Sequence, residues 1–292
     1  MGLVTLKEIL SESIEKKYAV GAFDTLDDNF TEAIIEAAEE EGLPVILMIP
    51  NFFWEKNDLS FYFTRLLDRC RRATVPVCLH LDHGRSFEDV MKAIHGGCTS
   101  VMFDGSALPI EENIAVTRKV VEAAHACGVS VEAEIGHVAS PEGELQASEA
   151  DETMYTSPED AAHFVQQTQV DALAVAVGTV HGIYKGTPKI DTRRLDEIRS
   201  RVSIPLVLHG GSGLPEEEFR AAIAHGINKV NFFTGLSLEA VKAIRQTLDD
   251  APTGKVHYIE LKEASHTAVK NTIKHQMKIF GTLPFNRKLL VQ

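Results

Sequence analysis

Short runs of apolar residues alternate with amphipathic segments along most of the chain. The apolar runs are rich in valine and isoleucine and mostly uncharged before their carboxyl ends, as buried parallel strands are. Eight such runs predict strands at 18–23, 44–49, 76–82, 99–103, 129–135, 172–177, 204–209 and 227–231. Segments of helical period between them predict helices at 28–41, 87–95, 111–127, 157–169, 191–201, 215–225 and 237–247. Eight alternating units predict the α/β class and a closed (β/α)8 TIM barrel.

A doubly wound sheet is the rival architecture, but the phosphate fingerprint G-x-G-x-x-G does not follow the first strand. A further helix is predicted at about 259–280, after the eighth unit. We therefore expect a single domain over 1–292, with the barrel at about 18–250 and a C-terminal helical tail at about 255–292. The tail should pack outside the barrel or against a partner subunit. The polar segment 136–155 is too long for a plain strand-to-helix connection, which marks it as a candidate lid.

Composition narrows the possible partners. The 292 residues are 44% hydrophobic and 24% charged, which is typical of a globular protein. The formal net charge of −13 repels nucleic acid and anionic lipid, and the longest apolar stretches are far shorter than a bilayer span. We expect no nucleic-acid or membrane partner and, since the first residues lack a leader pattern, a cytoplasmic protein. The four cysteines form no CxxC pair and are expected to be reduced, three of them in the core.

Polar residues gather at the predicted carboxyl ends of the strands, where the active sites of such barrels lie. His83, His181 and His209 follow the third, sixth and seventh strands. Three neutral imidazoles with an open coordination position are a common catalytic set for zinc or another divalent metal. Asp104 and Glu134 offer a further or alternate carboxylate position. We therefore predict a divalent metal site at the mouth of the barrel.

Two further features sit beside this predicted metal site. Asp82 precedes His83 directly, so a carboxylate that can donate or accept a proton lies next to a metal ligand. The Gly-Gly-Ser-Gly run at 210–213 precedes a helix and can cradle a phosphate, to which Lys185 can add a cation. Together these groups suggest chemistry on a phosphorylated carbonyl compound, either retro-aldol cleavage or isomerisation or epimerisation. A Schiff-base route is less expected, because Lys229 is the only lysine within the predicted strands.

Six motifs spread over nearly the whole chain are more specific than any single turn. They are YAVGAF at 18–23, LHLDHG at 79–84, SVEAEIG at 130–136, GTVHGIY at 178–184, LVLHGGSG at 206–213 and KVN at 229–231. Together they resemble the class II, metal-dependent ketose-bisphosphate aldolases, in particular the branch of tagatose-bisphosphate aldolase and its relatives. The resemblance implies a lyase that cleaves a ketose 1-phosphate or ketose 1,6-bisphosphate reversibly into glycerone phosphate and an aldehyde through a metal-stabilised enediolate. It also implies a homodimer or homotetramer.

The resemblance implies roles for individual residues. Zinc or a similar divalent ion is implied on His83, His181 and His209, with Asp104 and Glu134 at alternate metal positions. The implied catalytic residues are Asp82, which exchanges a proton with the aldehyde oxygen, Glu142 on the long loop, which shuttles the proton at C3, and Asn231, which steadies the enediolate. Phosphate and glycerone-phosphate contacts fall on Gly182, Lys185, Gly210, Ser212, Asn231 and Thr234, together with Gly211 of the cradle, and a monovalent-cation site for Na⁺ or K⁺ falls on the backbone of Val180, Gly182 and Gly210.

The sequence departs from the family pattern on the substrate side, at Asp24, Pro50, Phe233 and Gly235. The tail has no clear match for the arginine that holds the distal phosphate, and Lys262 or His266 would have to replace it. These departures indicate that the glycerone-phosphate half of the pocket is kept and the aldehyde half is rebuilt. They leave two other hypotheses open: a non-catalytic sugar-phosphate-binding or assembly subunit, and a metal-dependent sugar-phosphate epimerase.

Overall fold

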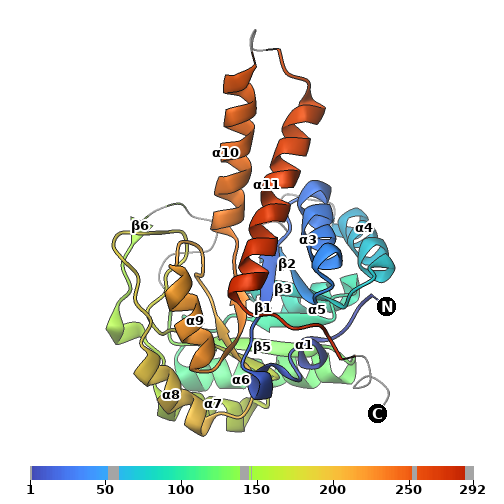
Figure 1. Cartoon of the computed structure of the whole chain (residues 1–292). Coiled ribbons are helices and arrows are strands. Elements are labelled where there is room, and N and C mark those ends of the chain that lie inside the picture. Colours follow the sequence, from blue (N-terminus) through green and yellow to red (C-terminus); the bar gives the residue numbers. More distant parts are fainter. Residues whose placement is uncertain (1, 52–58, 139–144, 146, 252–254, 287–292) are drawn as a thin grey trace.

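The computed structural model describes residues 2–51, 59–138, 145, 147–251 and 255–286. Eight strands close into a barrel in the order β1-β10-β9-β7-β5-β4-β3-β2, and neighbouring strands are parallel. The barrel strands are β1 (Val20–Asp24), β2 (Val45–Pro50), β3 (Val77–Gly84), β4 (Ser100–Phe103), β5 (Ser130–Ile135), β7 (Ala172–Val175), β9 (Leu206–Leu208) and β10 (Ile227–Asn231). The predicted (β/α)8 barrel is confirmed (Figure 1).

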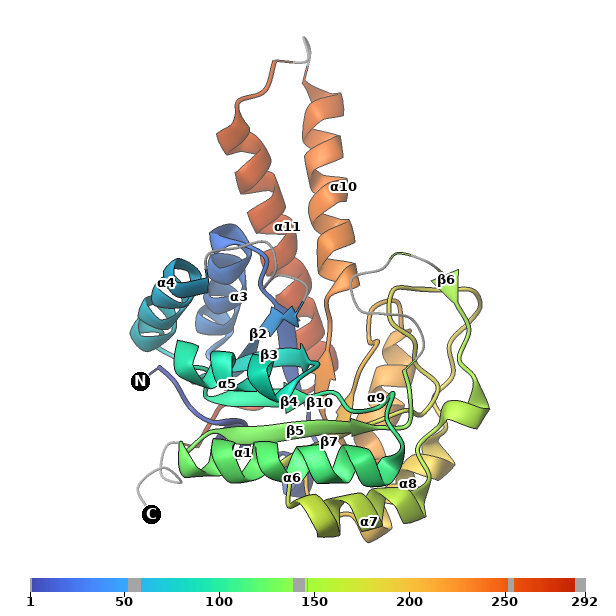
Figure 2. The ribbon, with the colours of Figure 1, turned by 180° about the vertical axis from the view of Figure 1, so that it is seen from behind.

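Helices follow the strands and surround the barrel (Figures 1 and 2). They are α3 (Asp28–Glu41), α4 (Leu59–Arg72), α5 (Phe87–Gly96), α6 (Ile110–Ala126), α7 (Pro158–Thr168), α8 (Thr192–Arg201), α9 (Glu216–Ala224), α10 (Thr234–Asp250) and α11 (Tyr258–Ile279). Two one-turn helices, α1 (Leu6–Ile9) and α2 (Ser13–Lys16), precede β1. Each helix predicted from the sequence is present, whereas α1, α2 and α4 are not among the predicted elements.

The alternation of side chains along the strands separates the barrel interior from the layer under the helices. One buried cluster joins strand residues to the N-terminal segment; its members are Val4, Leu6, Ile9, Leu10, Tyr18, Val20, Ala22, Ile46, Met48, Cys78, Ala172, Ala174 and Val207. Strand residues of the opposite parity, such as Phe23 and Leu47, pack with the helices in a larger cluster. α1 therefore closes the amino end of the barrel with apolar side chains, and the polar strand residues are left for the carboxyl end.

Local signals in the sequence fix the bounds of the outer helices. In α3, the Asp27 side chain accepts a hydrogen bond of 2.8 Å from the backbone N–H of Phe30, which caps the first turn. Gly42 ends the helix in the left-handed conformation, with φ at +69° and open space where a Cβ would stand. The buried face between these caps includes Ile34 and Ile35 and packs on the barrel.

Helices α10 and α11 run antiparallel and project beyond the barrel (Figures 1 and 2). α11 packs against α3 and β1, so the tail lies outside the barrel. This is one of the two positions predicted for it, the other being against a partner subunit. Ion pairs hold the α11–α3 contact: Glu36 Oε2 lies 2.9 Å from His266 Nε2 and 3.2 Å from Lys270 Nζ. Glu40 carboxylate oxygens lie 2.9 Å from Lys270 Nζ and 2.9 Å from Lys274 Nζ.

The candidate lid at 136–155 is anchored at both of its described ends. The His137 N–H donates to the Met154 carbonyl at 2.9 Å, at the short helix η2 (Glu152–Met154). Strand β6 (Ala147–Ser148) pairs in parallel with β8 (Ile183–Tyr184), which ties this segment to the loop that follows β7. Residues 139–144 and 146, and with them Glu142, lie outside the described residues. Across the described chain, every helix is too short or too polar to span a bilayer.

Candidate active site

Strand β3 delivers two adjacent polar side chains to the mouth of the barrel. Asp82 continues the inward alternation of the strand, and His83 reaches the same mouth because its backbone turns into the left-handed region, with φ at +48°. The register between β3 and β4 shifts at this point, between Leu81 and Gly84. A left-handed conformation costs a residue with a side chain about 1–2 kcal/mol, and such strain is concentrated at functional sites.

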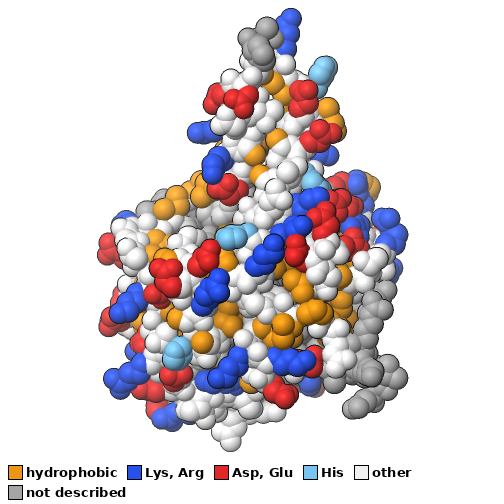
Figure 3. Space-filling view, in the orientation of Figure 1, with side chains coloured by type: hydrophobic (Ala, Val, Ile, Leu, Met, Phe, Trp, Pro, Cys, Tyr) orange, Lys and Arg blue, Asp and Glu red, His pale blue; other side chains and the backbone are white. Residues whose placement is uncertain are grey.

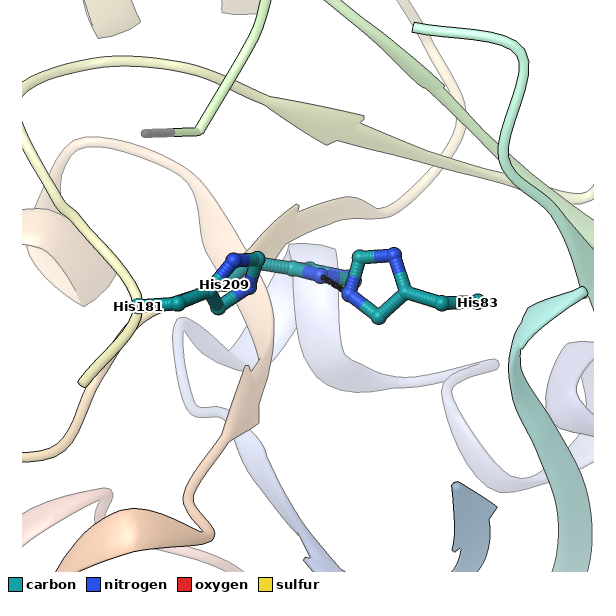
Figure 4. Close-up of side chains that lie close together, drawn as sticks. All are labelled: His83, His181 and His209. Carbon is teal, nitrogen blue, oxygen red and sulfur yellow. Dashed lines mark hydrogen bonds between the residues drawn. The ribbon is translucent and has the colours of Figure 1, made fainter. Parts of the chain in front are cut away.

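Three imidazoles converge at this mouth (Figure 4). The ring centroid of His83 lies 5.1 Å from that of His181 and 4.7 Å from that of His209, and the last two are 5.9 Å apart. All three side chains are buried. His83 Nε2 and His209 Nδ1 face one another at 2.9 Å. The three predicted metal-ligating histidines thus come together, with nitrogens close enough to share one ion.

Carboxylates behind two of these rings fix which nitrogen faces the centre. Asp104 Oδ2 lies 2.8 Å from His83 Nδ1, and Glu132 Oε1 lies 3.0 Å from His209 Nε2. If each carboxylate accepts the N–H of its imidazole, the two facing nitrogens both present lone pairs, and a proton or a metal ion between them makes the 2.9 Å approach favourable. Two nitrogens on a tetrahedral zinc at ~2.0–2.1 Å are roughly 3.3 Å apart. The donor set therefore fits zinc or a similar divalent ion.

A second group of ligands lies next to the first, formed by His83, Asp104 and Glu134. Burial opposes ionisation of Asp104, but hydrogen bonds from His83 and Ser106 outweigh it and hold its pKa below the usual range. Burial and the negative charge of Asp104 raise the pKa of Glu134 to about 8. Within the described residues, Glu134 Oε2 is buried without a hydrogen-bond partner. A buried carboxylate oxygen without a hydrogen-bond partner is compatible with a second cation position.

Asp82 and Asn231 face each other across the barrel. Asn231 Nδ2 donates to Asp82 Oδ1 at 2.9 Å, and both side chains are buried. Asn231 Oδ1 accepts from Lys229 Nζ at 2.7 Å. Lys229 and Glu132 are not among the site residues predicted from the sequence. Lys229 is two residues before Asn231 on β10, and Glu132 is two residues before Glu134 on β5, so each side chain points into the barrel like its predicted neighbour. This spacing of two residues is the signal that would have identified them.

The glycine-rich loop after β9 stands beside the histidines. Gly210 has φ at +67°, and a Cβ there would meet the Val180 carbonyl oxygen at 2.3 Å, so only glycine allows this approach. The Gly235 N–H donates to Ser212 Oγ at 3.0 Å, which ties the loop to the start of α10. A small cavity there is lined by His181, Gly182, Gly210, Gly211, Ser212, Asn231, Phe233 and Thr234. Nearly all the predicted phosphate-contacting residues thus border one cavity.

The remaining predicted residues are placed as follows. Lys185 is exposed on the loop that follows β8. The carbonyl of Gly210, predicted to hold a monovalent cation, accepts a 2.6 Å hydrogen bond from the Tyr184 hydroxyl. Asp24 is buried at the carboxyl end of β1, and Pro50 ends β2 in register with Asp82. Both proposed replacements for the tail arginine lie against α3: the Lys262 carbonyl accepts from Asn29 Nδ2 at 3.1 Å, and His266 pairs with Glu36.

The sequence and the structure are both similar to those of known aldolases. The family model described as fructose-bisphosphate aldolase class-II matches residues 4–283. The fructose-bisphosphate aldolase of Staphylococcus aureus (strain Mu50) is 41% identical over 287 residues, which cover 97% of this chain and 98% of that protein. The probable fructose-bisphosphate aldolase of Bacillus subtilis (strain 168) is 41% identical over 286 residues, which cover 97% and 99%.

Among solved structures, the YdjI aldolase from Escherichia coli K12 matches with a TM-score of 0.85 at 34% identity, over 96% of this chain and 98% of that one. These relatives confirm the resemblance and give no support to a binding-only subunit or an epimerase. The chain belongs to the class II, metal-dependent fructose-bisphosphate aldolase family.

Proposed function

We propose that this protein cleaves a ketose 1-phosphate or a ketose 1,6-bisphosphate reversibly into glycerone phosphate and an aldehyde. The observation that carries the proposal is one continuous site: three imidazoles converge, and Asn231, which is hydrogen-bonded to Asp82, lines the same cavity as His181 and the glycine-rich loop. A polarised carbonyl, a proton carrier and a phosphate anchor are the three parts that aldol cleavage of a phosphorylated ketose needs.

His83, His181 and His209 would hold a divalent metal, zinc being the ion that this donor set suits best, and Asp104 and Glu134 would offer an alternate position. When bound, the metal supplies Lewis acidity that polarises the substrate carbonyl. Asp104 and Glu132 keep His83 and His209 in the orientation that points a nitrogen at the ion.

The phosphate of the substrate would be held by backbone N–H groups and hydroxyls. Gly210, Gly211 and Ser212 lie in the loop after β9, and Thr234 begins α10, so a helix N-terminus faces the same cavity. Gly182 lines the cavity from the loop after β7. Lys185 is exposed three residues further along the chain, and its long side chain would bring a positive charge to the phosphate. With its phosphate bound in this cavity, the ketose would place its C3–C4 bond next to the three histidines.

Proton transfer is assigned to two side chains, Asp82 and Glu142, and a third, Asn231, supports it. Asp82 would take the proton of the C4 hydroxyl during cleavage and return it to the aldehyde oxygen during condensation. Asn231 would hold the carboxylate of Asp82 in place through its 2.9 Å hydrogen bond and donate to the oxygen on which charge develops. Glu142 is the proposed carrier of the proton at C3, and it lies outside the described residues.

The proposal is tested by coupled detection of glycerone phosphate released from a panel of ketose 1-phosphates and 1,6-bisphosphates, including the fructose and tagatose forms. We expect release that EDTA abolishes and zinc restores, with Asp82→Asn as an inactive control that still binds metal. The preferred panel member shows how Asp24, Pro50 and Phe233 set the aldehyde half. Full turnover in excess EDTA, or no release from any member by zinc-loaded protein, would refute the proposal.

A homodimer or homotetramer is proposed as the working assembly. Apolar side chains are exposed on the projecting helix pair, between charged ones (Figure 3). They include Leu238, Val241 and Leu248 on α10 and Tyr258, at 76% exposed, on α11. Light scattering should give a multiple of 32.1 kDa, and Val241→Asp together with Leu248→Asp should reduce it. A wild-type monomer at micromolar concentration would contradict this assembly.

Five further expectations from the sequence stay predictions. They are the single domain over 1–292, the cytoplasmic location, the absence of a nucleic-acid partner, the absence of a membrane partner, and the Na⁺ or K⁺ site on the backbone of Val180, Gly182 and Gly210. The cation site is the simplest to test, because replacing Na⁺ and K⁺ with tetramethylammonium should lower the rate of glycerone phosphate release. An unchanged rate would remove the site from the proposal.

A further inference from the structure

Lys229 is a fully buried charged residue inside the barrel, and its contacts all lead to the active site. Its ammonium nitrogen lies 2.9 Å from Glu132 Oε2, 3.1 Å from Glu132 Oε1 and 2.7 Å from Asn231 Oδ1. Taking an ammonium group out of water is costly unless it is paired and hydrogen-bonded, and an apolar pair in its place is often as stable. The pair therefore needs an explanation other than stability.

The first branch of contacts runs to a predicted metal ligand. Glu132 Oε1 is shared between Lys229 Nζ and His209 Nε2, at 3.1 Å and 3.0 Å. The ammonium holds the Glu132 carboxylate in one position, and that carboxylate holds the imidazole ring with Nδ1 toward His83. Residues behind a metal ligand typically change metal affinity by about 10–100-fold when they are removed.

The second branch runs to a proposed catalytic pair. An ammonium group can only donate hydrogen bonds, so the atom of Asn231 that faces Lys229 must be the amide oxygen. The amide NH₂ is then obliged to face Asp82 Oδ1, at 2.9 Å. A flipped amide would set NH₂ against the ammonium and oxygen against the Asp82 carboxylate, which are two repulsive contacts in a buried site.

We propose that Lys229 is a positioning residue whose single ammonium group fixes the ring of His209 and the amide of Asn231 at the same time. The inference rests on the proposed function for the reaction that it serves. It differs from a purely structural ion pair in one respect: a structural pair needs only charge balance between Lys229 and Glu132, whereas a positioning residue also determines the direction in which the Asn231 amide donates.

The test uses the double variant Lys229→Met/Glu132→Gln, because removing both charges leaves no lone buried ion and the new side-chain amide oxygen can still accept from His209. Glu132→Gln alone is the matched control, since it keeps the contact between Lys229 and Asn231. Circular dichroism and thermal unfolding establish that each variant is folded. Two readouts follow: the Co²⁺ dissociation constant with its visible absorption spectrum, and the rate at which glycerone phosphate exchanges its C3 proton with deuterated water.

For metal binding, we expect Lys229→Met/Glu132→Gln to bind Co²⁺ about 10-fold more weakly than the wild type, with an altered visible spectrum, whereas Asn231→Ala binds as the wild type does. An unchanged dissociation constant and spectrum would overturn the His209 branch. This readout does not depend on the protein being an aldolase.

For proton exchange, we expect Lys229→Met/Glu132→Gln to be ~10–100-fold slower than Glu132→Gln. In an Asn231→Ala background, removing Lys229 in the same way should slow exchange much less, because only the branch through His209 is left for Lys229 to act through. Equal slowing in both backgrounds would overturn the Asn231 branch, as would wild-type exchange in the double variant. If the Co²⁺-loaded wild type does not exchange glycerone phosphate, the proposed function fails, and the Co²⁺ binding measurement still decides the His209 branch.

Discussion

Gly210 is the position at which a single methyl group should disturb the site most. Its φ of +67° is matched by Gly42, at +69°, where nothing lies within 4 Å of a Cβ. A Cβ on Gly210 would instead stand 2.3 Å from the backbone oxygen of Val180, well inside the 3.0 Å that real Cβ contacts respect. Gly210→Ala and Gly42→Ala therefore share the conformational cost and differ only in the clash.

The two costs can be separated in magnitude. An alanine in the left-handed region costs about 1–2 kcal/mol, and this is all that Gly42→Ala should lose. Overpacking against a fixed backbone adds about 1–3 kcal/mol, so Gly210→Ala should lose about 2–5 kcal/mol. The strain would relax by moving the chain beside two proposed metal ligands, His181 and His209, and a displacement of about 1 Å at such a site costs about 100-fold in rate.

Urea unfolding followed by circular dichroism gives both free energies of unfolding, and coupled detection of glycerone phosphate gives kcat/KM. We expect Gly42→Ala to keep wild-type kcat/KM and Gly210→Ala to lose about 100-fold or more. If Gly210→Ala were as stable as Gly42→Ala and fully active, the close approach between the loops after β7 and β9 would not be what shapes the cradle.

Three other predictions follow from the same structure. Asp82→Asn should lower kcat by roughly 100-fold or more while leaving the Co²⁺ dissociation constant unchanged, and a rate within a few-fold of wild type would remove Asp82 from proton transfer. Hydrogen bonds from Lys270 and Lys274 lower the pKa of Glu40 to about 2. Burial alone would raise the pKa of Glu36, but its contacts with His266 and Lys270 outweigh burial and lower it. These ion pairs therefore stabilise the α11–α3 contact above pH 4.5, and the stabilisation is lost as the pH falls toward 2. Hydrogen exchange of α11 should accelerate over this window in the wild type but show no such step in Glu36→Gln/Glu40→Gln, and identical profiles would contradict the assignment. Burial raises the pKa of the Cys70 and Cys78 thiols to about 12 and also raises that of Cys98, so iodoacetamide at neutral pH should label only the exposed Cys127 until urea is added, as mass spectrometry can check.

The barrel could be predicted because periodicity is a property of each segment alone. Every inner strand alternates or runs apolar for a few residues, and every predicted helix presents one apolar stripe, so the number of units needs no tertiary information. Two of the helices that escaped prediction have weak local signals, because α1 and α2 have only four residues each and are too short to show a repeating apolar pattern. α4 is different: its apolar residues do recur at helical spacing, so its absence from the predicted elements is an omission of the prediction and not a weakness of the signal.

The site could be predicted only as far as side chains stand at strand ends. Asp82 and His83 are adjacent in sequence, and their joint arrival at the mouth depends on a left-handed turn that no pattern of residue types announces. Lys229 and Glu132 lie deeper in the barrel, and each becomes meaningful only because the closed topology sets β5 and β10 on opposite sides of one interior. The type of a residue indicates the chemistry that it can perform. Which side chains meet inside the barrel depends on how the strands are aligned with one another, and that alignment cannot be seen in the sequence.

The closed amino end of the barrel has a kinetic consequence. Since Leu6, Ile9 and Leu10 of the N-terminal segment fill that end with apolar side chains, a metal ion, a chelator and a substrate all have to use the mouth among the carboxyl ends of the strands. A ketose phosphate held in the proposed cradle would then stand in the path of a departing ion. The metal should therefore dissociate more slowly when substrate is bound. The rate at which a chelator inactivates the enzyme should then depend more on the substrate concentration than on the affinity of the chelator.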